Sequence, residues 1–386
     1  MTHQDDYTLK NKLVDQLLAN GLEELPELLR VLLNSAMKTE RENYLQAGDY
    51  ERTEERTGYA NGYKPKSVKT RLGEITFSIP QVRESGFYPS VLEKGLRSER
   101  ALTMSLAEMY VNGVSTRKVK VITEQLCGTE ISAEQVSRAT AQLDGVLQEW
   151  RERPLGEITY LFLDARYEKV RENSQIRDAA VLIATGITPD GQRQVLGISV
   201  SLSEHESHWN AFLRSLKERG MHGIELIISD DHAGLGAARR AVFGGIPWQR
   251  CQFHLQQNAG SYAPRQSMKV EIAADIRGMF NASDLKTAEE LLQSAIQKYA
   301  KSAPRLASWM ETNLAEGFTV FSFPLEHRRF IRTTNSLERI NKEIRRRTRV
   351  VGVFPNEASC LRLVSAFLME YSEEWQIGRR YCMASH

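Results

Sequence analysis

The chain has 386 residues, of which 41% are hydrophobic and 26% are charged, and its formal net charge is +2. This length exceeds one compact core, so we expect two to four domains of ordinary globular composition. No apolar run approaches the roughly 20 residues that span a bilayer, and the N-terminus lacks a signal-peptide core, so we expect a cytoplasmic protein with no membrane partner. The four cysteines are scattered without a CxxC pair, which indicates a reducing compartment and no disulfide framework.

The first hundred residues predict a helical region, a connector and a hairpin. Residues 1–67 begin with leucines at helical spacing and end in a stretch at 48–67 that is polar, rich in Gly and typical of an exposed connector. Residues 68–97 predict a small β hairpin, because apolar and polar residues alternate over 75–79 and Pro80 should stop the strand.

Residues 98–153 predict a helical domain. Gly113 breaks its first helix, and Ser132 caps a third helix whose inward face includes Leu143. A helix, a tight turn and a second helix have the spacing of a helix-turn-helix module, whose recognition helix lies in the major groove of DNA. A plain three-helix bundle is the alternative. The side chains that would contact bases or phosphates are Gln135, Ser137 and Arg138.

The next region predicts a mixed α/β sheet. A strand at 158–164 is apolar on both faces and should be central, with Asp164 at its end. Two further strands are joined by an Asp-Gly turn, and a helix and a buried strand at 224–229 follow before Asp230. Three antiparallel strands, a helix and a parallel strand open a ribonuclease-H-like sheet, in which the first and fourth strands are neighbours. We therefore expect Asp164 and Asp230 to lie side by side.

A long helical stretch and a basic helix complete the chain. From Asp230 to Glu338 the chain advances 108 residues, which are rich in helix formers and predict an all-α insertion at 259–325 within a catalytic domain at 154–258 and 326–386. Residues 326–349 hold nine Arg or Lys against three Glu, a local charge of +6. Such a segment indicates a polyanion partner, although a solvated helix face is the alternative.

Three acidic residues fit metal-dependent phosphoryl transfer. Two Mg²⁺ ions about 3.5–4 Å apart can activate the attacking oxygen and stabilise the leaving one, and Mg²⁺ prefers hard carboxylate oxygens. Asp164, Asp230 and Glu338 suit that role, and Mn²⁺ should substitute for Mg²⁺. Asp231 is an alternative to Asp230, and an ordinary surface pair with Lys342 is the alternative reading of Glu338.

Several motifs together resemble the Mutator-type transposases of bacterial insertion sequences. They are LFLDARYEKVR, ISDDHAGL, WQRCQFH and NSLERINKEIRRRTRVVGVFPN, with GVSTRKV and ISAEQVSR upstream, and the resemblance covers roughly residues 40–375. It implies a DDE transposase, in which helical DNA-binding parts precede a ribonuclease-H-like core that a helical insertion interrupts. Carried over position by position, the family's acidic triad is Asp164, Asp230 and Glu338.

The resemblance also implies a reaction and partners. Water attacks a phosphodiester at a transposon end, and the freed 3′-hydroxyl attacks another strand without a covalent intermediate. Double-stranded DNA with terminal inverted repeats is the expected partner, and a homodimer or higher oligomer should form on it, in a bacterial cytoplasm and with the nucleoid. Expected DNA contacts are Arg166, Arg250, His254, Asn335, Arg339, Lys342, Arg345, Arg346 and Arg347.

Other readings remain open at this point. Trp248 and Cys251 are expected to support the site, since Cys251 with His254 is only half a zinc site and no second pair lies nearby. No phosphate-binding GxxxxGK[ST] loop occurs, which excludes an ATP-driven mechanism encoded by this chain. Rival functions are a structure-specific DNA nuclease on the same fold and a non-catalytic DNA-binding repressor.

Overall fold

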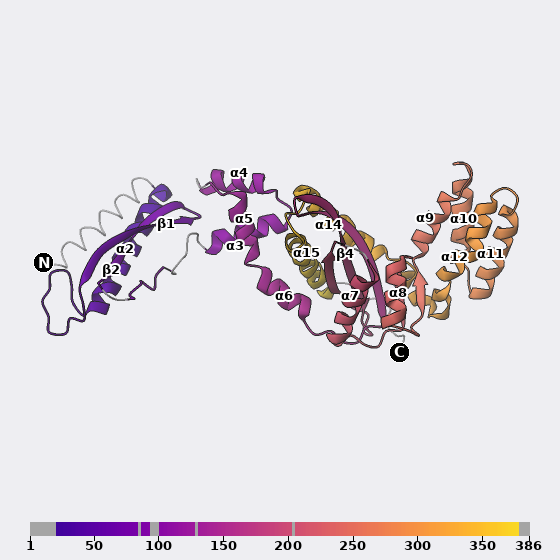
Figure 1. The fold of residues 1–386 in the computed structure, drawn as a ribbon, viewed down its shortest axis with the longest axis horizontal. Coiled ribbons are helices and arrows are strands. Elements are labelled where there is room, and N and C mark those ends of the chain that lie inside the picture. The colour runs from indigo at the N-terminus through magenta and orange to yellow at the C-terminus, as the bar shows by residue number, and fades with distance from the viewer. Residues whose placement is uncertain (1–20, 84–85, 93–99, 128–129, 203–204, 378–386) are drawn as a thin grey trace. The chain divides into compact units, whose positions relative to one another are not determined.

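The computed structural model describes residues 21–83, 86–92, 100–127, 130–202 and 205–377 (Figure 1). The chain divides into two compact units. The first comprises Met1–Tyr110 and Val114–Gln142, and the second comprises Val111–Gly113 and Leu143–His386. The first of the leucine-rich helices expected near the N-terminus lies outside the described residues.

The first unit begins with a helix packed on a two-stranded sheet. The short 3₁₀ helix η1 (Gly21–Glu24) leads into α2 (Leu25–Leu45), and β1 (Ala60–Thr70) pairs antiparallel with β2 (Gly73–Val82). Pro26 lies in the first turn of α2, where the absence of its N–H costs no helical hydrogen bond. The buried side chains between helix and sheet are Met37, Val68, Ile75, Phe77 and Ile79.

Two predictions about this part are wrong. Residues 60–67 form most of β1 and are not a connector, because their polar side chains occupy a strand that pairs along its length with β2. Pro80 does not stop the second strand but lies inside β2 opposite Tyr63. A two-stranded sheet tolerates this proline because each of its strands is an edge.

Three helices form the remainder of the first unit. They are α3 (Arg100–Val111), α4 (Thr116–Cys127) and α5 (Ala133–Ala141), around a core that includes Leu106, Val119 and Val136. The predicted start of α5 is confirmed, since Ser132 and Gln135 form a reciprocal capping box.

The prediction for Leu143 is wrong. The chain leaves the α5 helix at Gln142, and Leu143 precedes a fourth helix, α6 (Asp144–Glu152). There Leu143 packs with Leu147 and Ala366 of the second unit and not in the core of the three helices.

The second unit is built on a five-stranded mixed sheet in the order β5-β4-β3-β6-β7. The first three strands are antiparallel, and β6 and β7 add in parallel, so the predicted adjacency of the first and fourth strands is confirmed. This arrangement is compatible with a ribonuclease-H-like core. The strands are β3 (Tyr160–Glu172), β4 (Gln175–Ile187), β5 (Arg193–Ser201), β6 (Leu226–Ser229) and β7 (Trp248–Arg250).

The strand that carries Asp164 is longer than predicted. It continues to Glu172 and turns into β4 through Asn173 and Ser174, which have φ of 46° and 65°. The outer half of β3 is partly exposed and polar, so it lacks the apolar pattern from which a strand is recognised. Asp164 therefore lies within β3 and does not end it.

Helices cover both faces of the sheet. On one face α7 (Glu206–Glu218) and α8 (Ala233–Val242) pack against Leu161 and Leu163, and both helices are labelled near β4 in Figure 1. The opposite face contacts α14 (Asn335–Val351) and α15 (Glu357–Ile377).

The stretch from residue 252 to residue 331 is helical, as its composition predicted. Helices α10, α11 and α12 pack on one another around Ile276, Leu292 and Met310. The successive helices are α9 (Gln252–Ser261), α10 (Met268–Phe280), α11 (Leu285–Tyr299), α12 (Pro304–Asn313), η2 (Leu314–Gly317), η3 (Thr319–Ser322) and α13 (Leu325–Ile331).

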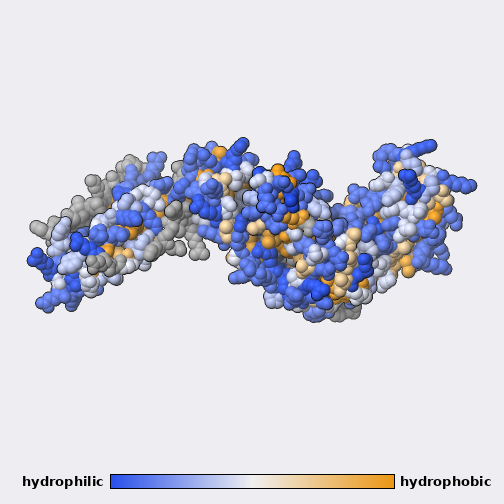
Figure 2. All heavy atoms as spheres, viewed as in Figure 1, coloured by the Kyte–Doolittle hydropathy of each residue, from blue (hydrophilic) through white to orange (hydrophobic). Residues whose placement is uncertain are grey.

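Within the described ranges, no helix combines the length and the apolar character that a membrane crossing needs. Hydrophilic residues predominate on the face of the molecule that Figure 2 shows.

Candidate active site

Two acidic residues lie just beyond the parallel pairing of the two central strands. Phe162 of β3 is in register with Ile228 of β6, and Asp164 and Asp230 each follow two residues later. The two carboxyl groups are close enough that the charge on Asp230 contributes to raising the pKa of Asp164. The predicted juxtaposition of these two residues is therefore present, although β3 continues past the site.

The third acidic residue reaches the same region from α14. The backbone N–H and the hydroxyl of Thr334 both donate to the Sγ atom of Cys251 at 3.4 Å, which fixes the start of α14 against the end of β7. One turn later the Glu338 N–H donates to the Thr334 carbonyl at 3.0 Å. On the opposite side of α14 the apolar residues Leu337, Ile340 and Ile344 are fully buried. The buried Cys251 thus holds the start of α14 in place.

Asp164 is held by two hydrogen bonds. Its Oδ1 accepts from the Ala165 N–H, and its Oδ2 accepts from Nδ2 of Asn341, both at 2.8 Å. Burial nevertheless raises the pKa of Asp164 to about 6, because the charged carboxylate loses solvation. Asn341 was not identified from the sequence, and the available signal was its position three residues after Glu338, on the same face of the helix.

His254 on α9 lies among the three acidic residues. Its Nε2 is 3.9 Å from Oε1 of Glu338. A hydrogen bond with Cys251 and the nearby charges of Cys251, Asp230 and Asp164 raise the pKa of His254 to about 9, although burial opposes the shift. The raised pKa favours the positively charged form of His254, whose Nε2 faces Glu338.

Arg250, expected to bind DNA, is buried beside the acidic residues. Its side chain is 5% exposed, and its Nη1 is 2.9 Å from Glu316, 3.3 Å from Asp231 and 3.0 Å from Oδ1 of Asn313. Its Nε is 3.9 Å from Oδ1 of Asp230. Arg250 thus links the end of β6 to the end of α12, and its charge is directed at protein carboxylates.

The basic residues of α14 and β3 occupy different environments. Arg347 is buried, with ion pairs to Glu343 and Glu370 and the Phe367 ring 4.3 Å away. Arg166 is also largely buried and bonds the carbonyl of Asn341 and the carboxylate of Glu168. The exposed members of the predicted set on α14 are Asn335, Arg339, Lys342, Arg345 and Arg346.

Two of these exposed residues line a pocket of about 280 Å³ at the start of α14. Asn335 and Arg339 form part of its wall, and two further arginines and three aromatic rings complete it. The other lining residues are Arg193, Arg329, Phe330, Thr333, Ser336, Tyr371 and Trp375.

In the first unit, the three residues predicted to contact DNA lie on α5. Ser137 and Arg138 are exposed, whereas the side chain of Gln135 accepts a hydrogen bond from the Ser132 N–H at 2.8 Å. In the second unit Trp248 donates from Nε1 to the Ser229 hydroxyl at 2.9 Å, which joins the ends of β6 and β7.

The acidic residues have the donor chemistry that a hard divalent cation requires. Buried oxygens of Asp230, Glu338 and Asn341 accept no hydrogen bond from any described residue, and all three are hard donors. As the side chains stand, no three His, Cys, Asp or Glu residues within the described ranges are gathered tightly enough to hold a metal ion. The residues fit Mg²⁺ or Mn²⁺ in kind, and their side chains would have to rotate to bind one.

Comparison with known proteins identifies the family. The family model "Transposase, Mutator family" matches residues 1–378. The chain is 58% identical over 367 residues to the transposase for insertion sequence element IS406 of Burkholderia multivorans, with 95% of each chain covered. It is 43% identical over 382 residues to the transposase for ISRM5 of Rhizobium meliloti, with 99% of this chain and 96% of the relative covered. It is 38% identical over 385 residues to the transposase for IS256 in transposon Tn4001 of Staphylococcus aureus, with 98% of each covered.

The chain is an α/β protein whose mixed sheet carries acidic residues just past the parallel pairing of its central strands, next to a basic helix. Such a site is suited to acting on a polyanion. The chain belongs to the Mutator family of transposases. It is therefore a DNA transposase, and the resemblance stated from its motifs is confirmed.

Proposed function

We propose that this transposase cleaves and joins the ends of an insertion sequence by DDE chemistry, with Asp164, Asp230 and Glu338 as the acidic triad. The proposal is supported by Asp164 and Asp230, which follow paired positions of β3 and β6, and by Glu338, whose Oε1 lies 3.9 Å from Nε2 of His254. The charges of both aspartates also act on His254. Two of the three have buried oxygens without a hydrogen bond. Phosphoryl transfer needs charge stabilisation in this position more than it needs covalent chemistry.

Mg²⁺ or Mn²⁺ would be held by these three carboxylates, and it would supply the positive charge that stabilises the attacking and leaving oxygens. The chain's own residues prepare the site for that role. Asn341 fixes the orientation of Asp164, and Arg250 fixes the loop that bears Asp230 and Asp231. The positive charge of His254 lowers the repulsion among the carboxylates while they face one another.

DNA would be bound by surfaces on both units. On α14 the exposed Arg339, Lys342 and Arg345 are placed to neutralise phosphates near the acidic residues. On α5 we assign the groove contacts of a helix-turn-helix to Ser137 and Arg138, since Gln135 is already engaged in its capping box. Terminal inverted repeats are the proposed recognition sequence. Joining two ends requires at least a dimer on DNA, and such a complex would be found with the nucleoid.

A strand-joining assay tests the mechanism. Labelled oligonucleotide ends and target DNA are incubated with the full chain and Mg²⁺. The Asp164→Ala, Asp230→Ala and Glu338→Ala variants are compared with Glu289→Ala, a control that removes an exposed carboxylate from α11. We expect joined product from the wild type and the control, and at least a ~10³-fold loss in each triad variant. Cleavage without joining would indicate a nuclease, and binding without either reaction would indicate a repressor.

A further inference from the structure

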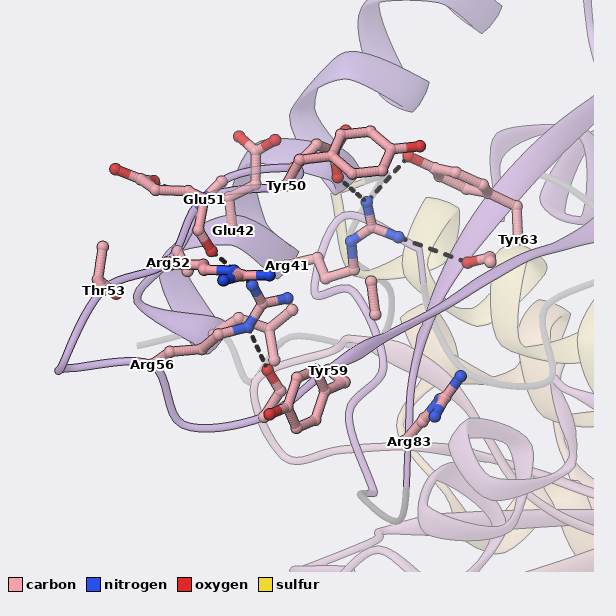
Figure 3. A pocket seen from close by; sticks show the side chains of 17 residues that line it. Arg41, Glu42, Tyr50, Glu51, Arg52, Thr53, Arg56, Tyr59, Tyr63 and Arg83 are labelled. Carbon is pink, nitrogen blue, oxygen red and sulfur yellow. Dashed lines mark hydrogen bonds and ion pairs between the residues drawn. The ribbon is translucent and has the colours of Figure 1, made fainter.

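A pocket of about 990 Å³ lies in the first unit, between the end of α2, the loop that follows it and β1. The loop was expected from the sequence to be a plain exposed connector. Instead it contributes, with its neighbours, four arginines and three tyrosines to one concave surface (Figure 3). These residues are Arg41, Arg52, Arg56, Arg83, Tyr50, Tyr59 and Tyr63.

Arg41 is the buried arginine of the pocket and contacts two of the segments that form it. Its side chain is 2% exposed, and its Nη2 donates to Oδ1 of Asp49 at 3.1 Å and to the Tyr63 hydroxyl at 3.0 Å. Arg41 thus ties the loop to β1, as Figure 3 shows. Burying a charged side chain costs solvation free energy unless specific partners compensate for it, and Arg41 has such partners on two segments. The wall of the pocket is therefore a defined part of the fold.

The loop itself is held in a defined conformation. The Arg56 side chain donates to the carbonyls of Glu51 at 2.6 Å and Gly58 at 2.8 Å, and the Thr57 N–H donates to the Leu45 carbonyl at 3.0 Å. Tyr50 has a φ of +62°, a left-handed backbone that bulky residues rarely adopt, and its side chain is fully exposed. Strained backbone of this kind clusters at ligand-binding and active sites, so Tyr50 is a candidate contact residue.

The charges of the pocket leave arginines available for an anion. All three acidic lining residues have partners, because Glu42 and Asp49 pair with Lys38 and Glu51 accepts from the Gly48 N–H at 2.8 Å. Arg52 and Arg83 are exposed, and within the described part of the chain neither guanidinium group forms a hydrogen bond or an ion pair. These two guanidinium groups can therefore bind phosphate.

The tyrosines add a stacking surface beside these cations. The Arg56 guanidinium lies 5.0 Å from the centre of the Tyr59 ring, and Tyr59 still exposes 65% of its surface. Exposed rings next to arginines are the arrangement by which proteins hold unpaired nucleotides, with bases on the rings and phosphates on the cations. A pocket of this volume encloses a small ligand, whereas duplex DNA is read by an element that enters its groove.

We propose that this pocket, which we call the Tyr59 pocket, binds an unpaired stretch of DNA of one or two nucleotides. Tyr59 and Tyr50 stack on the bases, and Arg52 and Arg83 pair with the phosphates. This proposal rests on the function proposed above in one respect, which is that the bound polymer is DNA. A transposon end that is being cut and joined exposes unpaired nucleotides.

Fluorescence anisotropy of the full chain with labelled (dT)₈ and with a duplex of equal length tests this proposal. The variants are Tyr59→Ala, Tyr59→Phe and Arg52→Ala, and the control is Lys64→Ala, which removes a charge from the opposite side of β1 outside the pocket. We expect Tyr59→Ala to weaken (dT)₈ binding by about 5- to 150-fold and Tyr59→Phe to restore it. Arg52→Ala should lower the slope of the logarithm of the (dT)₈ association constant against the logarithm of the salt concentration by about 0.7. Lys64→Ala should leave the effect of Tyr59→Ala on (dT)₈ binding unchanged.

Other outcomes would overturn the proposal. If Tyr59→Ala and Arg52→Ala bind (dT)₈ as the wild type does, the pocket holds no nucleotide. If Tyr59→Ala weakens (dT)₈ and duplex equally, the surface is a general DNA contact and not a site for unpaired bases. Should the alanine variant unfold, the Arg52→Ala slope and photo-crosslinking of 4-thiothymidine oligonucleotide to the wild type decide the question, with adducts expected on peptides spanning 50–63.

The outcomes also separate this proposal from the DDE mechanism. A wild-type chain that binds (dT)₈ through Tyr59 but joins no strands would contradict the mechanism and leave the pocket standing. A chain that joins strands normally while Tyr59→Ala has no effect on either assay would contradict the pocket alone.

Discussion

Arg250 offers the sharpest test of how the acidic site is supported. The structure predicts that this arginine is a positioning residue, because its buried guanidinium faces Asp230, Asp231 and Glu316 and not solvent. Arg250→Ala removes the positive charge and leaves three carboxylates facing one another. Arg250→Lys keeps the charge but loses the planar fork that contacts several partners at once.

The size of the effect follows from the exposure of the partners. Breaking a fully buried ion pair costs about 3–5 kcal/mol. The carboxylates here are 39%, 51% and 40% exposed, so water can solvate them and the cost should be smaller, at about 1–3 kcal/mol. For a domain of this size a loss of about 2 kcal/mol corresponds to a fall in Tm of roughly 4–8 °C.

Thermal unfolding and strand joining measure the two consequences separately. We expect Arg250→Ala to lower Tm as above and to reduce joining at least ~10-fold at a temperature where the variant is folded. Arg250→Lys should recover part of the stability and less of the joining rate. A variant that keeps the wild-type Tm but binds DNA less tightly would refute this reasoning, because it would show that Arg250 contacts DNA.

Three further predictions concern residues on β3 and α14. The pKa of Asp164 is about 6 in the fold against an ordinary 3.8, so without divalent metal the wild type should lose stability as pH rises between about 4 and 6. Asp164→Asn should therefore be more stable than the wild type at pH 7, by at most about 3 kcal/mol. If chemical unfolding gave the wild type and this variant parallel curves of stability against pH, the prediction would be contradicted. Asn341→Ala removes a hydrogen bond that lowers the pKa of Asp164, so without divalent metal the pH window of the Asp164-dependent loss of stability should move to higher pH. An unchanged window would mean that Asn341 does not act through Asp164. Lys342→Ala should lower the salt slope of DNA binding by about 1 without altering the pH profile, and an unchanged slope would remove it from the interface.

The parts of the fold that the sequence predicted are those with a regular apolar pattern. The adjacency of β3 and β6 followed from two buried strands separated by a hairpin and a helix. The outer half of β3 was missed because exposed residues such as Tyr167 provide no apolar alternation.

The parts that could not be predicted depend on contacts between distant residues. An arginine is normally exposed, and only the meeting of Arg250 with Glu316, 66 positions away, makes it a buried link. The order in residues 48–58 depends in the same way on the buried Arg41, whose partners come from the loop and from β1. A polar sequence by itself does not distinguish such a loop from a flexible connector.

The central claim is that Asp164, Asp230 and Glu338 converge on divalent metal when DNA is bound. A crystal structure of the full chain with insertion-sequence end DNA and Mn²⁺ tests it most directly, since the anomalous signal locates the ions. We predict two Mn²⁺ ions about 3.5–4 Å apart, each bound by oxygens of these three residues. Ions bound elsewhere, or a Glu338 carboxylate more than ~10 Å from the other two in that complex, would contradict the account.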